Sequence, residues 1–173
     1  MTALTRTPQN TNYLQPTKFL LTFDRIKTVQ YFCQSANLPG LSLGEATINT
    51  PTIDLYVPST KLKYNTFTVV FTVDEAVQSW KELYNWFLSM AAPSGFDERN
   101  QLKSMQNYNK MKESNFSDGT LTILSALNNP IAAVQFENMF PLSLSDIQFD
   151  TKLSADTIIT ASATFRYDSF KFI

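Results

Sequence analysis

Residues 65–73 read NTFTVVFTV, and residues 74–91 follow directly as DEAVQSWKELYNWFLSMA. In the first stretch, large apolar residues occupy every second position from Phe67 to Val73, with threonine at most positions between them. This period of two predicts a β-strand with one buried face and one hydroxyl-rich face. In the second stretch the period changes to that of a helix, which predicts an α-helix over residues 74–91.

The predicted helix carries one apolar stripe, which we expect to face the core with Trp80 as a buried side chain. The members of this stripe are Val77, Trp80, Tyr84, Phe87, Leu88 and Ala91. Its amino end carries Asp74 and Glu75, which suit the positive end of the helix dipole. Pro93 and Gly95 then end the helix.

Alternating segments on both sides of this unit predict further strands. The predicted strands cover residues 19–23, 29–34, 53–57, 120–126, 132–138 and 159–167, with one more through Ile48 that is interrupted at Pro51. We expect the first two to pair as a hairpin. The fold class that follows is mainly β: an antiparallel β-barrel or sandwich with one central α-helix. No repeat and no internal linker divides the chain, so residues 17–173 are predicted to form one domain.

Two segments have few apolar anchors. Residues 1–16 are rich in Thr, Asn, Gln and Pro and predict an extended N-terminal arm. Residues 93–118 predict a long loop, and loops of this length without secondary structure are usually functional or disordered.

Composition excludes several classes of function. The 173 residues include no histidine and one cysteine, Cys33, so a Ser-His or Cys-His catalytic pair, a His-ligated metal and an internal disulfide cannot form. The net charge of −1 is unlike that of a sequence-reading DNA-binding protein. We therefore expect a chain that is not an enzyme and that holds no cofactor, no metal and no small-molecule substrate.

Uncharged polar residues replace many of the usual charges: the chain has 20 Thr, 15 Ser, 13 Asn and 9 Gln, and only 17% charged residues. Such a surface favours contact with another polar surface, as in an assembly subunit. The charges that remain include a basic group in the long loop and an acidic group nearer the carboxyl end. We predict that they meet between neighbouring subunits; the candidates are Arg99, Lys103, Lys110 and Lys112 with Glu137, Asp146, Asp150 and Asp156.

The ordered set of these segments resembles the tail tube proteins of contractile-tailed, T4-like bacteriophages. The residues that carry the resemblance are 31–34 (YFCQ), 37–40 (NLPG), 67–69 (FTV) before Asp74-Glu75, Trp80 to Trp86, 140–141 (FP) and 165–168 (FRYD). The resemblance implies a small β-barrel with one helix, assembled as hexameric rings that stack into a tube. It further implies a sheath protein outside the tube, baseplate and tail-terminator proteins at its ends, and passing DNA in the lumen. The location implied is the virion tail, assembled in the host bacterial cytoplasm.

Within this interpretation, the polar face of one or both long strands is expected to line the lumen. The candidates are Thr66, Thr68 and Thr72 in one strand and Thr160, Ser162 and Thr164 in the other. A wall with few cationic side chains would avoid trapping DNA phosphates, because each Lys or Arg contact adds affinity by counterion release. Two alternatives stay open: a tube initiator, terminator or baseplate ring of the same fold, and a carbohydrate-binding β-sandwich module.

Overall fold

The computed structural model of the chain describes residues 12–91, 95, 116–152, 154 and 157–173. Antiparallel strands dominate this part of the chain, which confirms the predicted mainly β class. The elements in order are β1 (Phe19–Phe23), α1 (Lys27–Tyr31), β2 (Cys33–Ala36), β3 (Leu41–Asn49), β4 (Asp54–Tyr64), β5 (Phe67–Thr72), α2 (Gln78–Ala91), β6 (Ser117–Leu124), β7 (Pro130–Leu144), β8 (Thr160–Arg166) and β9 (Ser169–Phe172).

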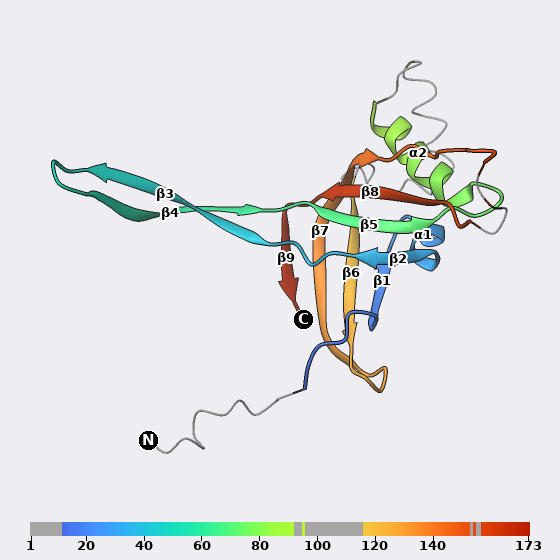
Figure 1. Cartoon of the computed structure of the whole chain (residues 1–173), viewed down its shortest axis with the longest axis horizontal. Coiled ribbons are helices and arrows are strands. Elements are labelled where there is room, and N and C mark those ends of the chain that lie inside the picture. Colours follow the sequence, from blue (N-terminus) through green and yellow to red (C-terminus); the bar gives the residue numbers. More distant parts are fainter. Residues whose placement is uncertain (1–11, 92–94, 96–115, 153, 155–156) are drawn as a thin grey trace.

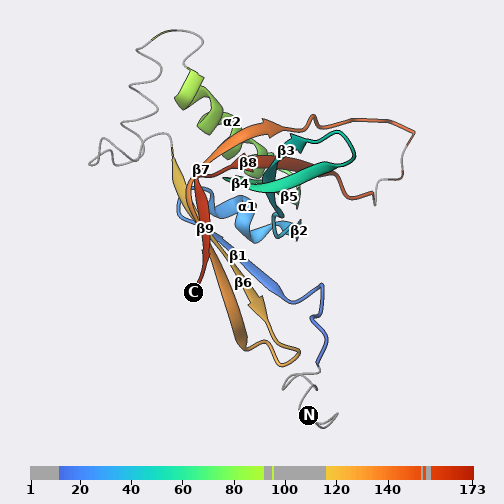
Figure 2. The ribbon, with the colours of Figure 1, turned by 90° about the vertical axis from the view of Figure 1, so that its left-hand side faces the viewer.

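The main sheet has seven strands in the order β1-β6-β7-β8-β5-β2, with β9 also paired to β7. Figure 1 shows that β1, β6 and β9 run across the direction of β5 and β8, so the sheet folds over on itself around a core. Strand β7 belongs to both parts, because its first half pairs with β6 and β9 and its end pairs with β8. Helix α2 lies against one end of this folded sheet (Figure 2).

A bulge lets β7 change direction. Asn138 has a φ of 54°, a left-handed conformation that asparagine tolerates better than most residues. Its backbone N–H donates to Asp118 Oδ1 at 3.0 Å, and its side-chain amide donates to Asp168 Oδ2 at 2.8 Å. These contacts hold the bulged residue where the pairing with β6 shifts register between Ser117 and Gly119.

The core fills the space between the two parts of the sheet and the helices. It is dominated by aromatic side chains, and Phe67 lies 4.6 Å from Phe136 between ring centroids. Gly119 is required here, because a Cβ at this position would lie 2.8 Å from Met139 Sδ and 3.1 Å from Phe23 Cδ1. The core residues of β5 and β8 are Phe67, Val69, Phe71, Ala161, Ala163 and Phe165.

The predicted hairpin between residues 19–23 and 29–34 is wrong. Strand β1 pairs with β6 instead, and Lys27–Tyr31 forms the short helix α1. The amino end of α1 is held from outside, since Glu82 of α2 accepts hydrogen bonds from the Thr28 backbone N–H at 3.1 Å and the Thr28 hydroxyl at 2.5 Å. This tertiary contact overrides a local pattern that suits a strand.

Helix α2 begins at Gln78, four residues later than predicted, and buries a different face. Its fully buried side chains are Ser79, Leu83, Trp86 and Ser89. Trp80 is only partly buried, and Tyr84, stacked on it at 5.4 Å, is 44% exposed. The predicted stripe around Trp80 is therefore rotated away from the actual core face.

Asp74, which precedes α2 in the chain, caps the amino end of this helix with its side chain. Its carboxylate accepts hydrogen bonds from the backbone N–H groups of Gln78 at 3.0 Å and Ser79 at 2.8 Å, and from the Ser79 hydroxyl at 2.8 Å. These bonds, above all the one from the Ser79 N–H, lower the pKa of Asp74 from 3.8 to about 2. They also satisfy helix N–H groups that have no partner within the helix.

Asp74→Ala is expected to cost about 0.5–2 kcal/mol of stability at neutral pH. A carboxyl with a lowered folded-state pKa adds stability above its unfolded value of 3.8 and loses it as the pH falls toward about 2. The difference in urea midpoint between Asp74→Ala and the unsubstituted chain should therefore shrink over this acid range. Glu75→Ala, at the exposed neighbouring carboxylate, is the control, and its difference in urea midpoint from the unsubstituted chain should not shrink in this way. A constant difference from neutral pH to pH 2 would contradict the capping role.

Candidate functional site

The two strands singled out by their hydroxyl residues lie side by side in the sheet. Strands β5 and β8 pair so that Thr68 is opposite Thr164, Val70 is opposite Ser162, and Thr72 is opposite Thr160. Residues directly opposite each other in an antiparallel pair point to the same face. The sequence candidates from both strands therefore form one continuous surface, which we call the hydroxyl face.

The hydroxyl face lies opposite the core. Phe165 of β8 points inward to α2, where its ring centroid is 6.1 Å from that of Trp86. Because α2 packs on the inward side, the hydroxyl face is left partly exposed on the outward side. Its members are Thr66, Thr68, Val70, Thr72, Thr160, Ser162 and Thr164.

Uncharged polar groups extend the hydroxyl face at both edges of the strand pair. On the β2 side, Gln34 Nε2 donates to Thr72 Oγ1 at 2.8 Å, and Asn37 Oδ1 accepts the Thr68 backbone N–H at 2.6 Å. On the β7 side, Ser145 Oγ accepts the Ser162 backbone N–H at 2.9 Å. The groups that form these bonds are uncharged, so the surface combines many hydrogen-bonding groups with little charge.

The charge on β5 and β8 is confined to one end. Arg166 is the sole charged residue of the two strands, and it ends β8. A polyanion passing over the hydroxyl face would therefore meet few of the cationic contacts that give nucleic-acid binding its affinity. The hydroxyl face can therefore contact a polyanion without binding it tightly.

The structure describes three of the eight charged residues expected between subunits: Glu137, Asp146 and Asp150. Arg99, Lys103, Lys110, Lys112 and Asp156 lie outside the described residues. Asp146 and Asp150 are exposed between β7 and β8, and the Asp150 side chain accepts the Lys152 backbone N–H at 2.9 Å.

Glu137 of β7 already has partners in its own chain. Its carboxylate lies 2.6 Å from Lys171 Nζ and accepts the Ser169 hydroxyl at 2.9 Å. The bond from Lys171 lowers the pKa of Glu137. The Glu137 carboxylate is therefore less available for an ion pair with a neighbouring subunit than the carboxylates of Asp146 and Asp150.

Sequence reasoning missed the most prominent surface of the molecule. Among the described strands, β3 and β4 pair only with each other and form a long hairpin that projects from the body (Figure 1). Its register places Ile48 opposite Leu55 and Ala46 opposite Val57, so these four residues share one face. Ile48, Leu55 and Val57 are each more than 40% exposed, and no part of the described chain covers this apolar face.

An isolated two-stranded hairpin is marginally stable in water, and one with an apolar face needs a partner to cover it. The tip is closed by Thr50, whose hydroxyl donates to the Ile53 carbonyl and accepts the Ile53 N–H. The signal in the sequence was the succession of apolar residues on both sides of Pro51, which predicts strands but not their isolation from the core.

Within the described residues, no His, Cys, Asp and Glu side chains gather in threes as a metal site requires. None of the described helices combines the length and hydropathy needed to cross a membrane.

Comparison with known proteins gives one family and one fold. A family model described as "Phage tail tube protein" matches residues 6–173. A sequence comparison with curated proteins finds no significant match.

The fold is similar to that of three chains from contractile injection systems. The tube-terminating cap of the anti-feeding prophage is 14% identical, with a TM-score of 0.61 and coverage of 100% of this chain and 99% of that one. A chain from the PVC sheath/tube terminator in the extended state is 14% identical, with a TM-score of 0.61 and coverage of 95% and 99%. A chain from the PVC sheath-tube complex in the extended state is 14% identical, with a TM-score of 0.59 and coverage of 93% and 91%.

Proposed function

Because the chain belongs to the phage tail tube protein family, whose members are structural and not enzymes, we propose that it is the repeating subunit of a tail tube. In this proposal, subunits form hexameric rings that stack into a tube inside a contractile sheath. DNA passes through the lumen at ejection, and baseplate and terminator proteins close the two ends of the tube. The tube belongs to the virion tail.

The observation that carries the proposal is the hydroxyl face of β5 and β8. A tube wall must present a surface that hydrogen-bonds water but does not hold phosphate groups. Three cross-strand positions, from Thr68 and Thr164 to Thr72 and Thr160, supply such a surface, and Arg166 lies at its edge. We propose that this face lines the lumen.

The contacts between rings are proposed to include the charged residues predicted from the sequence. Asp146 and Asp150 are the exposed acidic members, and the basic members are those at positions 99, 103, 110 and 112. A single exposed ion pair contributes about 0.2–1 kcal/mol, but in a stacked polymer the same pair repeats at every subunit.

Electron microscopy of the purified chain tests the proposal. We expect stacked rings or hollow tubes, and a chain that stays monomeric at high concentration would contradict spontaneous assembly. The copy number of the chain in purified particles then separates the repeating subunit from a ring at one end of the tube. A dominant band of 19.6 kDa supports the repeating subunit, whereas a minor band indicates an end ring.

Ser162→Lys in the assembled particle is expected to slow DNA release while leaving assembly intact. The new cation would lie on the hydroxyl face and would recur in every subunit along the path of the DNA. Ser162→Gln, which is long but neutral, is the control and should eject at the original rate.

The ejection rate is measured at low and high salt, and the slowing should diminish with salt because counterion release is salt-dependent. If Ser162→Lys and Ser162→Gln eject DNA at equal rates at low salt, this face of the sheet does not line the lumen.

A further inference from the structure

Two cationic side chains lie at one end of the hydroxyl face. Tyr64 at the end of β4 and Tyr167 just after β8 pack edge to face, with 5.9 Å between their ring centroids, and Tyr167 is buried in the core. Lys63 and Arg166 each precede one of these tyrosines by one residue, so their side chains point away from the core. Arg166 also follows Phe165, which points inward, and therefore lies on the side of the hydroxyl face. We call Lys63 and Arg166 the cation pair.

The cation pair has no counterion in the described part of the chain. Both side chains are exposed, and neither forms an ion pair or donates a side-chain hydrogen bond there. The strand neighbours of Arg166 are uncharged: Phe140 lies opposite it on β7, and Thr66 directly precedes β5. The carboxylate nearest to Arg166 in the sequence, that of Asp168, accepts the side-chain amide of Asn138 at 2.8 Å. Two cations without a local partner attract an anion from outside the chain.

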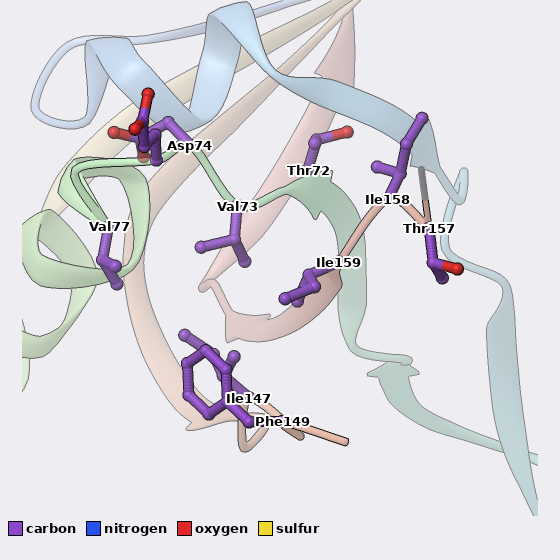
Figure 3. A pocket seen from close by; sticks show the side chains of 10 residues that line it. Thr72, Val73, Asp74, Val77, Ile147, Phe149, Thr157, Ile158 and Ile159 are labelled. Carbon is purple, nitrogen blue, oxygen red and sulfur yellow. The ribbon is translucent and has the colours of Figure 1, made fainter. Parts of the chain in front are cut away.

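The other end of the hydroxyl face carries carboxylates. Beyond Thr72, Asp74 and Glu75 line a pocket of about 460 Å³ together with apolar side chains (Figure 3). None of the described residues that line this pocket is a lysine or an arginine. A phosphate group would therefore be repelled from the Thr72 end of the hydroxyl face and attracted to the end that carries Arg166.

The position of the cation pair indicates which anion it meets. The pair lies on the same side of the strands as Thr68 and Thr164, so a lumen lined by the hydroxyl face is also lined by the pair. Duplex DNA carries one negative charge for about every 1.7 Å of its axis. Lysine and arginine are the side chains that most often bind phosphate oxygens. The anion of matching chemistry in the lumen is therefore the phosphate backbone of DNA.

We propose that Lys63 and Arg166 form a phosphate-binding band in the lumen, which contacts the backbone of the passing DNA at one level of every ring. This inference rests on the proposed function, because it requires the hydroxyl face to line the lumen. All copies in a ring bring their cation pairs to the same level, and the uncharged hydroxyl face separates one band from the next. The band binds phosphate groups and not base edges, so it acts on DNA of any sequence.

The double substitution Lys63→Gln with Arg166→Gln in the assembled particle tests the band. Both positions are exposed, so folding and assembly should be retained. We expect the double variant to eject DNA severalfold faster than the unsubstituted particle at low salt. One phosphate contact changes in affinity about threefold between 50 and 200 mM salt, so the ejection rate of the variant should also depend less on salt. Lys152→Gln, which removes an exposed cation between β7 and β8, is the matched control and should eject DNA at the original rate.

The outcomes in assembled particles decide for or against the band. Faster ejection and a weaker salt dependence in the double variant, without a change in the Lys152→Gln control, support it. Equal ejection rates in the double variant and the unsubstituted particle, or an equal acceleration by Lys152→Gln, overturn it. A double variant that folds but forms no particles places the two cations between subunits and also overturns the band. If the double variant does not fold, Lys63→Gln and Arg166→Gln are measured singly, and the absence of any acceleration in both overturns the band.

The same experiments keep the band separate from the proposed function. If Ser162→Lys slows ejection while the double variant ejects at the original rate, the band is overturned and the hydroxyl face still lines the lumen. If the unsubstituted chain forms no rings or tubes, the proposed function fails, and the band fails with it.

Discussion

Trp86→Ala is expected to destabilise the folded chain by about 3–5 kcal/mol, the range for removing a buried aromatic side chain from a packed core. Trp86 is 0% exposed, and it is the largest of the fully buried side chains. Its ring contacts Phe165 of β8 at a centroid distance of 6.1 Å, so it links α2 to the central strands. Its loss would leave a cavity that the surrounding rings cannot fill.

The same substitution removes the aromatic ring that Arg25, a half-buried cation, contacts. The Arg25 guanidinium carbon lies 5.0 Å from the centre of the Trp86 ring, and Arg25 Nη2 donates to Ser89 Oγ at 3.1 Å. Burial lowers the pKa of Arg25, because the charged guanidinium loses part of its solvation here. Cation–π contacts of this kind add about 0.5–2 kcal/mol. The cost of Trp86→Ala should therefore lie toward the upper end of the range.

Trp80→Ala is the matched control because it removes the same atoms from the same helix. Trp80 is partly buried, its Nε1 donates to the Ser145 carbonyl at 3.1 Å, and its ring stacks on the exposed Tyr84. Urea unfolding should show a clearly smaller loss for Trp80→Ala than for Trp86→Ala. Equal losses, or a larger loss at Trp80, would contradict the burial of Trp86 as the main anchor of α2.

The choice between these two tryptophans shows where sequence reasoning ends. Hydrophobic periodicity predicted the helix, but it chose the stripe with the most apolar residues, around Trp80 and Tyr84. The actual core face includes Ser79 and Ser89, whose hydroxyls find partners in Asp74 and in the Trp86 carbonyl. A buried serine with a local hydrogen bond has no hydrophobic signal, so the pattern alone could not identify this face.

The strands show the same division between local and tertiary information. The alternation in β5 and β8 was predictable, because a buried face and a hydroxyl face recur there with a period of two. Helix α1 was not predictable, since its amino end is held by Glu82, which is more than 50 residues away in the chain. The sequence predicted the hydroxyl residues of each strand as separate candidates for a lumen wall. Only the register of β5 against β8, which places Thr68 opposite Thr164, shows that they form one face.

The paired substitution Ile48→Lys with Leu55→Asp is expected to abolish assembly without unfolding the chain. These residues are directly opposite each other in the hairpin, so the new side chains can form a cross-strand ion pair that preserves the pairing. Both positions are about half exposed and lie outside the core, so the melting temperature of the body should not change. The apolar face of the hairpin, however, would become charged, and an interface that buries it would lose its hydrophobic contribution.

The next pair along the hairpin supplies the control for this substitution. Thr47 is opposite Tyr56, one residue along each strand, and therefore points to the other face. Thr47→Lys with Tyr56→Asp introduces the same two charges one residue farther from the tip, on the other face, and it should retain assembly. Sedimentation velocity and electron microscopy measure the two variants side by side. If the Ile48/Leu55 variant assembles as well as the Thr47/Tyr56 variant, the apolar face of the hairpin is not buried between subunits. The comparison tests this face directly, because burying exposed apolar side chains in an interface stabilises the assembly.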